Sequence, residues 1–295
     1  MSKKNRVFNT ICSIWVTCFI LLASAPLVTL ALPTTQLIPL PPETSITPPT
    51  ENPSEKNIDI AISNNEPEYD SYTYAERQEE QLPTILPATE KHYGNKVVYL
   101  TFDDGPDEKN TPMILDILKE HDIKATFFVL GTEIEKHPAI LQRIYDEGHA
   151  IGNHSYNHIY RELYRSAATY TEQLHHNDKV IKNVLGVRPF ISRAPGGSAG
   201  SFTKEYWDAL HNQGYIEVGW NISSGDASSA KADHIFNNIV HQTENNKFLW
   251  SHAILLMHDS RGHEETVKAL PQIIAFYKNH GFEFNVINTK TPPAW

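Results

Sequence analysis

Cysteine is nearly absent from this 295-residue chain. Its two cysteines, Cys12 and Cys18, both lie in an apolar run close to the N-terminus. The rest of the chain therefore cannot form a disulfide, even in a compartment that would permit one. Its stability has to come from an apolar core and from any bound metal.

Positive charge is also scarce. The chain has 25 Lys and Arg residues against 35 Asp and Glu residues, which gives a formal net charge of −10. This balance argues against the basic surface that nucleic-acid binding requires. No glycine-rich dinucleotide fingerprint follows the first predicted strand, so no motif points to a dinucleotide cofactor.

The first 32 residues have the pattern of an export signal. Lys3, Lys4 and Arg6 precede an apolar run from about residue 11 to residue 32. A basic start followed by an apolar core is typical of a secretory signal peptide, and this run is also long enough to be an uncleaved membrane anchor. In both cases we expect the rest of the chain outside the membrane, secreted or anchored at the cell wall.

Residues 33–94 are interpreted as a disordered linker. They are rich in Pro, Thr, Ser, Glu and Asn, and their apolar residues are too sparse to bury a core. Such a composition is typical of an extended spacer. The linker would give the following domain reach into the cell wall.

Residues 95–290 are predicted to form one α/β domain. Short apolar segments alternate with amphipathic helical patterns, about seven times in roughly 200 residues, which predicts parallel strands with crossover helices. A closed or distorted (β/α) barrel fits this pattern better than an open sheet. The sequence indicates no oligomeric state. The predicted strands are 97–100, 125–130, 150–153, 190–193, 215–220, 253–257 and 282–287, and the predicted helices are 111–121, 138–147, 168–185, 203–213, 232–240 and 264–279.

The first predicted strand ends on two adjacent carboxylates. Asp103 and Asp104 are followed at once by the turn residues Gly105 and Pro106. In α/β folds, the carboxyl ends of parallel strands are where catalytic groups usually lie. The alternative is that both acids only cap the loop and the following helix.

Two histidines follow the third predicted strand. His154 and His158 are four residues apart, a spacing that on a helical turn places side chains on one face, about 5–6 Å apart at Cβ. Both imidazoles can then bind one metal ion. Together with one carboxylate they would leave open positions for water and substrate, which suits zinc, with cobalt as an alternative. The same pair, taken alone, also fits surface histidines in a polar loop.

An arginine and two glycines follow the fourth predicted strand. Arg193 ends that strand, and Gly196 and Gly197 come shortly after it. A buried arginine is costly without an acidic partner, and it can hold a carboxylate ionised and oriented. The glycines let backbone N–H groups approach a ligand closely. A structural arginine beside a glycine loop is the alternative.

A third histidine ends the sixth predicted strand. Four apolar residues lead to Met257 and His258, and Asp226 precedes this strand in the sequence. A histidine at a strand end is a natural general acid near neutral pH, and Asp226 could orient it and favour its charge. The alternative is a core histidine bound to a backbone carbonyl.

These motifs together resemble the polysaccharide deacetylases of carbohydrate esterase family four, the NodB homology domain. TFDDG, HSxxH, RxP and LLxH stand in the family's order, at predicted strand ends, between about residues 97 and 287. The resemblance implies a distorted (β/α) barrel that removes N-acetyl groups from amino-sugar polymers. Peptidoglycan N-acetylglucosamine is the expected substrate.

The resemblance also implies individual roles. Asp103 is expected to be the general base, positioned by Arg193. A divalent ion is expected on Asp104, His154 and His158.

The remaining motif residues are expected to bind substrate and move a proton. The backbone N–H of Gly196 would join the oxyanion site, and Leu256 would line the pocket for the acetyl methyl group. His258 would be the general acid, paired with Asp226.

The chain departs from the family's pattern at two positions. Gly196 and Ala227 stand where many members have an aromatic residue, and we expect both changes to open the substrate groove. Chitin oligosaccharides and N-acetylmuramic acid are therefore alternative substrates. Two other classes are a glycosidase with two catalytic carboxylates, which gives the histidines no role, and a barrel that binds glycan without catalysis.

Overall fold

The structure is a computed structural model, and it describes residues 65–295. The predicted signal or anchor segment, residues 1–32, and the first part of the predicted linker lie outside these residues. Between residues 65 and 295, no helix combines the length and the apolar character needed to cross a membrane.

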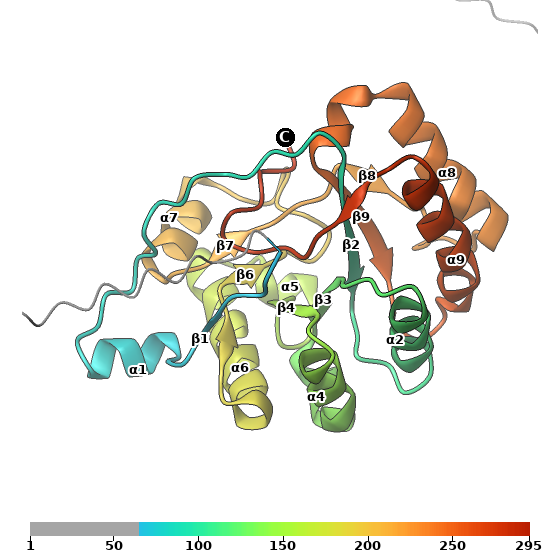
Figure 1. The fold of residues 1–295 in the computed structure, drawn as a ribbon. Helices are drawn as coiled ribbons and strands as arrows, with labels where there is room; N and C mark the ends of the chain where they lie inside the picture. Colours follow the sequence, from blue (N-terminus) through green and yellow to red (C-terminus); the bar gives the residue numbers. More distant parts are fainter. Residues whose placement is uncertain (1–64) are drawn as a thin grey trace, which may run out of the picture. The chain divides into compact units, whose positions relative to one another are not determined.

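Parallel strands form the central sheet (Figure 1). Their order is β7-β6-β4-β3-β2-β9-β8, and β10 pairs with β2 beside them. Within residues 65–295, β7 and β8 at the two ends of this order are not hydrogen-bonded to each other, so the sheet is a curled half-barrel and not a closed one. The strands are β2 (Val97–Asp103), β3 (Thr126–Val129), β4 (Ala150–Asn153), β6 (Ile191–Ser192), β7 (Ile216–Glu217), β8 (Ile222–Ser223), β9 (Ala253–His258) and β10 (Glu283–Phe284).

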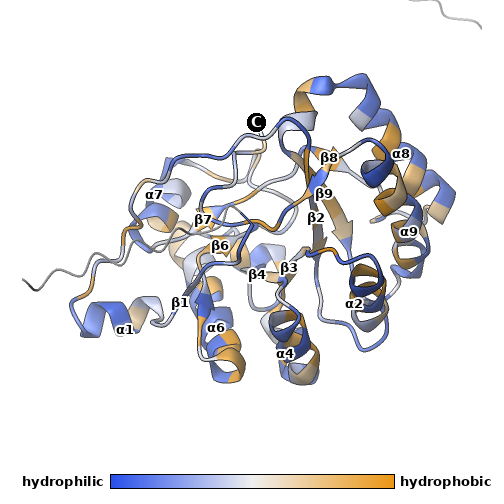
Figure 2. Cartoon of the chain, in the orientation of Figure 1, coloured by the Kyte–Doolittle hydropathy of each residue, from blue (hydrophilic) through white to orange (hydrophobic). Residues whose placement is uncertain are grey.

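Helices connect these strands and bury their apolar sides against the sheet (Figures 1 and 2). In α2, for example, Ile114, Leu115 and Leu118 are fully buried and belong to the main core. The helices are α2 (Asn110–Glu120), α3 (Gly131–Lys136), α4 (Pro138–Asp146), α5 (Tyr160–Leu163), α6 (Ala167–Leu185), α7 (Lys204–Asn212), α8 (Ala232–Asn245) and α9 (Glu264–Asn279). The predicted alternation of strands and helices is confirmed, while α3, α5 and β8 were not predicted.

The register of the sheet brings the predicted site residues to one edge. Every residue of β2 is buried, and its last residue, Asp103, pairs with His258 at the end of β9. On the other side of β2, Asn153 of β4 pairs with Ser192 of β6. The loops that follow β4 and β6 therefore start side by side.

Residues 65–94 are not the disordered linker that their composition predicts. β1 (Tyr69–Asp70) pairs antiparallel with β5 (Arg188–Pro189). The helix α1 (Tyr74–Glu79) begins at a reciprocal capping box made by Thr73 and Glu76. Both elements belong to the same compact unit as the sheet.

A buried ion pair explains why residues 65–94 are folded onto the domain. Asp70 accepts hydrogen bonds from Arg188, with Nη2 at 3.1 Å from Oδ2, and from Arg77, with Nε at 2.6 Å. Tyr69 packs its ring 5.3 Å from that of Tyr145. The segment is too polar to form a core of its own, so its few apolar and charged side chains pack against and hydrogen-bond to residues of the domain. Sequence composition does not reveal such distant partners.

Candidate active site

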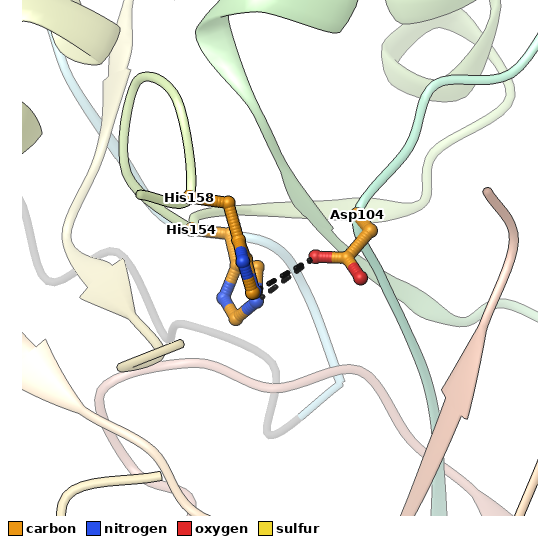
Figure 3. A group of neighbouring side chains, drawn as sticks. All are labelled: Asp104, His154 and His158. Carbon is orange, nitrogen blue, oxygen red and sulfur yellow. Dashed lines mark ion pairs between the residues drawn. The ribbon is translucent and has the colours of Figure 1, made fainter. Parts of the chain in front are cut away.

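One carboxylate and two imidazoles from separate loops converge beyond the carboxyl ends of the strands. Asp104 directly follows β2, and its Oδ1 lies 3.3 Å from Nε2 of His154 and 3.4 Å from Nε2 of His158 (Figure 3). The ligand atoms of the three residues all lie within 4.8 Å of one another. The structure thus brings together the three residues expected to share a metal ion.

The two histidines reach this position through an irregular loop and not through a helical turn. Ser155 has φ 85° and His158 has φ 57°, both in the left-handed region that a helix cannot contain. The His158 N–H donates to Oγ of Ser155 at 3.1 Å, and the Gly131 N–H donates to the Ser155 carbonyl at 3.3 Å. The predicted helical turn is wrong because these bonds hold the segment in a different shape.

The donor set fits a cation. Nδ1 of His154 lies 2.8 Å from the carbonyl oxygen of Arg193, and a carbonyl only accepts, so Nδ1 carries the proton. The neutral imidazole then turns the lone pair of Nε2 toward Asp104 Oδ1. That oxygen is buried and has no hydrogen-bond partner among the described residues. Two facing acceptors repel each other unless a cation or a further proton lies between them, so these residues suit a metal ion.

The pKa shifts keep Asp104 ionised and move the two histidines in opposite directions. Burial alone would raise the pKa of Asp104, but the His154 and His158 imidazoles outweigh burial and hold this pKa well below its usual range. Burial lowers the pKa of His158, against the attraction of Asp104. Burial would also lower the pKa of His154, but the charges of Asp103 and Asp104 outweigh burial and raise it. A metal ion binds the carboxylate and the neutral imidazoles, so it would displace the proton that these acids favour on His154.

The second acid is held by a buried arginine. Oδ1 of Asp103 accepts a hydrogen bond from Nη1 of Arg193 at 2.9 Å. Nη1 also donates to the Thr101 hydroxyl at 2.6 Å, and Nε donates to the Val218 carbonyl at 2.9 Å. The guanidinium carbon lies 4.1 Å from the centre of the Phe128 ring. These contacts fix the guanidinium, which in turn fixes one oxygen of Asp103.

The third histidine is paired with the acid expected for it. Nδ1 of His258 lies 2.8 Å from Oδ1 of Asp226. The other Asp226 oxygen accepts from the His258 backbone N–H and from the Thr266 hydroxyl, each at 2.8 Å. Burial would lower the pKa of His258, but the bond to Asp226 and its charge outweigh burial and raise this pKa to about 9. His258 is therefore protonated at neutral pH.

Two polar residues that the sequence analysis missed hold the site loops. Glu217 Oε1 accepts from the Ala194 N–H at 2.7 Å, and its Oε2 accepts from the Ser192 hydroxyl at 3.2 Å. Asn153 Oδ1 accepts from the Ser155 N–H at 3.0 Å. The available signal was a polar residue inside or at the end of a predicted strand, which a buried parallel sheet tolerates only when it is hydrogen-bonded.

The substrate-side residues lie around this centre, with one change from expectation. Gly196 has φ 72°, and a Cβ there would stand 2.7 Å from Oη of Tyr160. Gly196 therefore does not leave the open space that was expected, because Tyr160 stands where a side chain of residue 196 would be. Leu256 is half-buried in β9 and Ala227 is exposed. Leu256 lies two residues before His258, so both side chains share one face of the strand.

The fold is a half-barrel of parallel strands, and a candidate metal site of Asp104, His154 and His158 lies at the strand ends. These two features define the class of α/β protein to which the chain is compared. Within that class, the family model described as polysaccharide deacetylase matches residues 90–218. A peptidoglycan N-acetylglucosamine deacetylase of Bacillus cereus is 36% identical over 199 residues, which are 65% of this chain and 67% of the relative. The chain belongs to the polysaccharide deacetylase family.

Solved structures agree with this assignment. The catalytic domain of a peptidoglycan N-acetylglucosamine deacetylase from Eubacterium rectale has a TM-score of 0.61 at 31% identity, covering 70% of this chain and 96% of that domain. A family-four carbohydrate esterase of Streptococcus mutans has a TM-score of 0.62 at 31% identity, covering 70% of this chain and 99% of the other. The expected family is confirmed.

Proposed function

We propose that this chain hydrolyses the N-acetyl group of N-acetylglucosamine units in peptidoglycan. Its similarity to a deacetylase of that substrate in Bacillus cereus supports the proposal. The observation that carries it is the position of the Asp103–Arg193 pair directly beside the cluster of Asp104, His154 and His158.

Asp104, His154 and His158 would hold a divalent metal ion, with zinc as the first choice and cobalt as the alternative. When bound, such an ion polarises the acetyl carbonyl and lowers the pKa of water. Oδ1 of Asp104, which is buried and has no hydrogen-bond partner among residues 65–295, would gain a partner in such an ion.

Asp103 is suited to be the general base. Arg193 occupies its Oδ1, which leaves Oδ2 for the reaction, and this oxygen lies 3.8 Å from Nε2 of His154. It therefore faces the metal-site side. Asp103 would take a proton from the water whose oxygen adds to the acetyl carbonyl carbon.

His258 is suited to be the general acid. Its Nδ1 is bound to Asp226, so Nε2 is the atom that can give a proton to the sugar nitrogen. The C–N bond then breaks, and the products are acetate and a free amine. The backbone N–H of Gly196 would stabilise the negative oxygen formed during the addition, and Leu256 would contact the acetyl methyl group.

The two rival classes receive no support from these contacts. A glycosidase needs two carboxyl groups placed about 5–9.5 Å apart across a sugar, whereas Asp104 is turned to the two imidazoles. A barrel that only binds glycan would have no use for the buried pair of Asp103 and Arg193 or for a charged His258.

The proposed substrate places the enzyme outside the cell membrane. The N-terminal 32 residues would export it or anchor it there, and this segment would be its only contact with a membrane. The partner of the folded domain is then the cell-wall polysaccharide.

Acetate release from purified peptidoglycan tests the proposal, with chitin oligosaccharides as the competing substrate. The protein is assayed as purified, after chelation, and after zinc or cobalt is added back. Mass spectrometry of the digested product shows whether glucosamine or muramic acid residues have lost acetyl groups. Release from peptidoglycan glucosamine that stops on chelation and returns with metal is expected, and glycan chain cleavage without acetate would overturn the proposal.

A further inference from the structure

Tyr160 stands at the proposed active site without an assigned role. It begins α5, two residues after His158, and its ring lies edge-on to that imidazole, with ring centres 5.3 Å apart and planes at 83°. Tyr160 is 52% exposed. A ring in this position offers a ligand an apolar face and a polar tip.

The hydroxyl of Tyr160 lies over the backbone of Gly196. Its Oη is 2.7 Å, and its Cε1 3.0 Å, from where a Cβ of residue 196 would stand. The φ of 72° at Gly196 is one that side-chain-bearing residues rarely adopt. The space beside the backbone of Gly196 is thus filled by Tyr160 and not by a side chain of residue 196.

This hydroxyl is free to donate to a ligand. A tyrosine hydroxyl keeps its proton at neutral pH. Within residues 65–295 no protein group accepts a hydrogen bond from it. Tyr164, by contrast, donates its hydroxyl to the Pro195 carbonyl at 2.5 Å and is committed to holding the loop.

We propose that Tyr160 is a substrate-contacting residue that sets affinity for the acetylated sugar. Its ring covers the sugar beside Gly196, and its hydroxyl donates a hydrogen bond to an oxygen of the bound amino sugar. This inference rests on the proposed deacetylase function, because the ligand is the N-acetylated sugar of that reaction.

Steady-state kinetics of Tyr160→Phe and Tyr160→Ala on an N-acetylglucosamine oligosaccharide test the proposal. Loss of one uncharged hydrogen bond predicts a KM that rises about three- to tenfold in Tyr160→Phe, with kcat within about twofold. Removal of the ring in Tyr160→Ala raises KM by about tenfold or more.

Tyr93 provides a matched control. It is 55% exposed, and its ring lies edge-on to His252, with centres 5.4 Å apart and planes at 82°. His252 precedes β9, whereas His258 ends it, so Tyr93 lies at the other end of the strand from the site. Tyr93→Phe should leave both KM and kcat unchanged.

A binding measurement separates this inference from the proposed function. Asp103→Asn, which should bind without hydrolysis, is titrated with the same oligosaccharide by calorimetry, with and without Tyr160→Phe. A Kd that rises about three- to tenfold on loss of the hydroxyl supports the role of Tyr160 even if the parent chain releases no acetate.

Two results would overturn it. One is a KM and a Kd within twofold of the parent values for both Tyr160 variants. The other is a loss of bound zinc in Tyr160→Phe, measured by elemental mass spectrometry, because Tyr160 would then act by holding His158 and not by contacting sugar.

Discussion

Oδ1 of Asp103 and Nη1 of Arg193 lie 2.9 Å apart, and both side chains are buried. The same arginine is bound through its carbonyl to His154. One residue therefore orients both the proposed base and a proposed metal ligand. The two neighbouring acids have different partners and therefore different roles, since Asp103 is bound to a guanidinium and Asp104 faces two imidazoles.

These different roles predict that the same Asp→Asn substitution has different effects on activity and metal content at positions 103 and 104. Asp103→Asn should lower acetate release about 10²- to 10⁴-fold, the usual contribution of a general base, and should keep its metal. Asp104→Asn should lose both metal and activity, because the amide is a weaker ligand than the carboxylate. Metal content by mass spectrometry and acetate release are measured on both proteins. Equal metal content in the two variants would contradict the assignment.

The Asp226–His258 pair predicts the alkaline limb of the pH profile. Because the pKa of His258 is raised to about 9, kcat/KM should fall as the pH rises through about 9 and the general acid loses its proton. Asp226 favours the charged imidazole, so Asp226→Asn should lower that pKa and move the limb by about 1–2 units to lower pH. Initial rates between pH 6 and pH 10 measure the shift.

Glu265 supplies the control for that experiment. It lies one residue before Thr266, which donates to Asp226, and it pairs with Lys268 at 2.7 Å. Glu265→Gln removes a nearby charge without touching the pair, so its alkaline limb should stay in place. If the alkaline limb moves equally in Asp226→Asn and Glu265→Gln, the shift comes from a general loss of negative charge and not from the bond between Asp226 and His258.

The sequence predicts those parts of the fold that depend on local pattern. The strand that ends at Asp103 and the helices that follow it carry their apolar residues at regular spacing, so their positions can be deduced from residues close in the chain. The open edge of the half-barrel depends on β7 and β8, which are not paired with each other among the described residues, and the two-residue strand β8 leaves almost no pattern. The number and closure of strands therefore could not be deduced.

The parts that sequence analysis missed depend on distant partners. The left-handed residues Ser155 and His158 are held by bonds that include Gly131, from another loop. Tyr160 meets Gly196 only because β4 and β6 are adjacent. The chemistry of the site could be predicted because residue types and order carry it, whereas the shape of its loops could not.

The buried pair of Asp70 and Arg188 predicts that residues 65–94 stabilise the domain. Asp70→Ala should lower the free energy of unfolding by about 3–5 kcal/mol, since it leaves a buried guanidinium short of one acid. Asp116→Ala is the control, because Asp116 is largely exposed and pairs with Arg143 on the surface, so its loss should cost about 0–1 kcal/mol. Urea unfolding measures both, and equal costs would argue against a structural role for Asp70.

Glu217 predicts a pH-dependent contribution to stability. Burial raises the pKa of Glu217 from 4.5 to about 7, so between these values the folded state holds a proton that the unfolded chain releases. Stability from this group is therefore present at low pH and is lost as the pH rises toward 7. Glu217→Gln cannot titrate, so the unfolding free energy of the parent minus that of the variant should fall by about 1–2 kcal/mol between pH 5 and pH 8, a value reduced for partial exposure. Urea titrations at both pH values measure it. A constant difference would mean that Glu217 is already ionised at pH 5, and that it holds the Ala194 N–H as a carboxylate throughout.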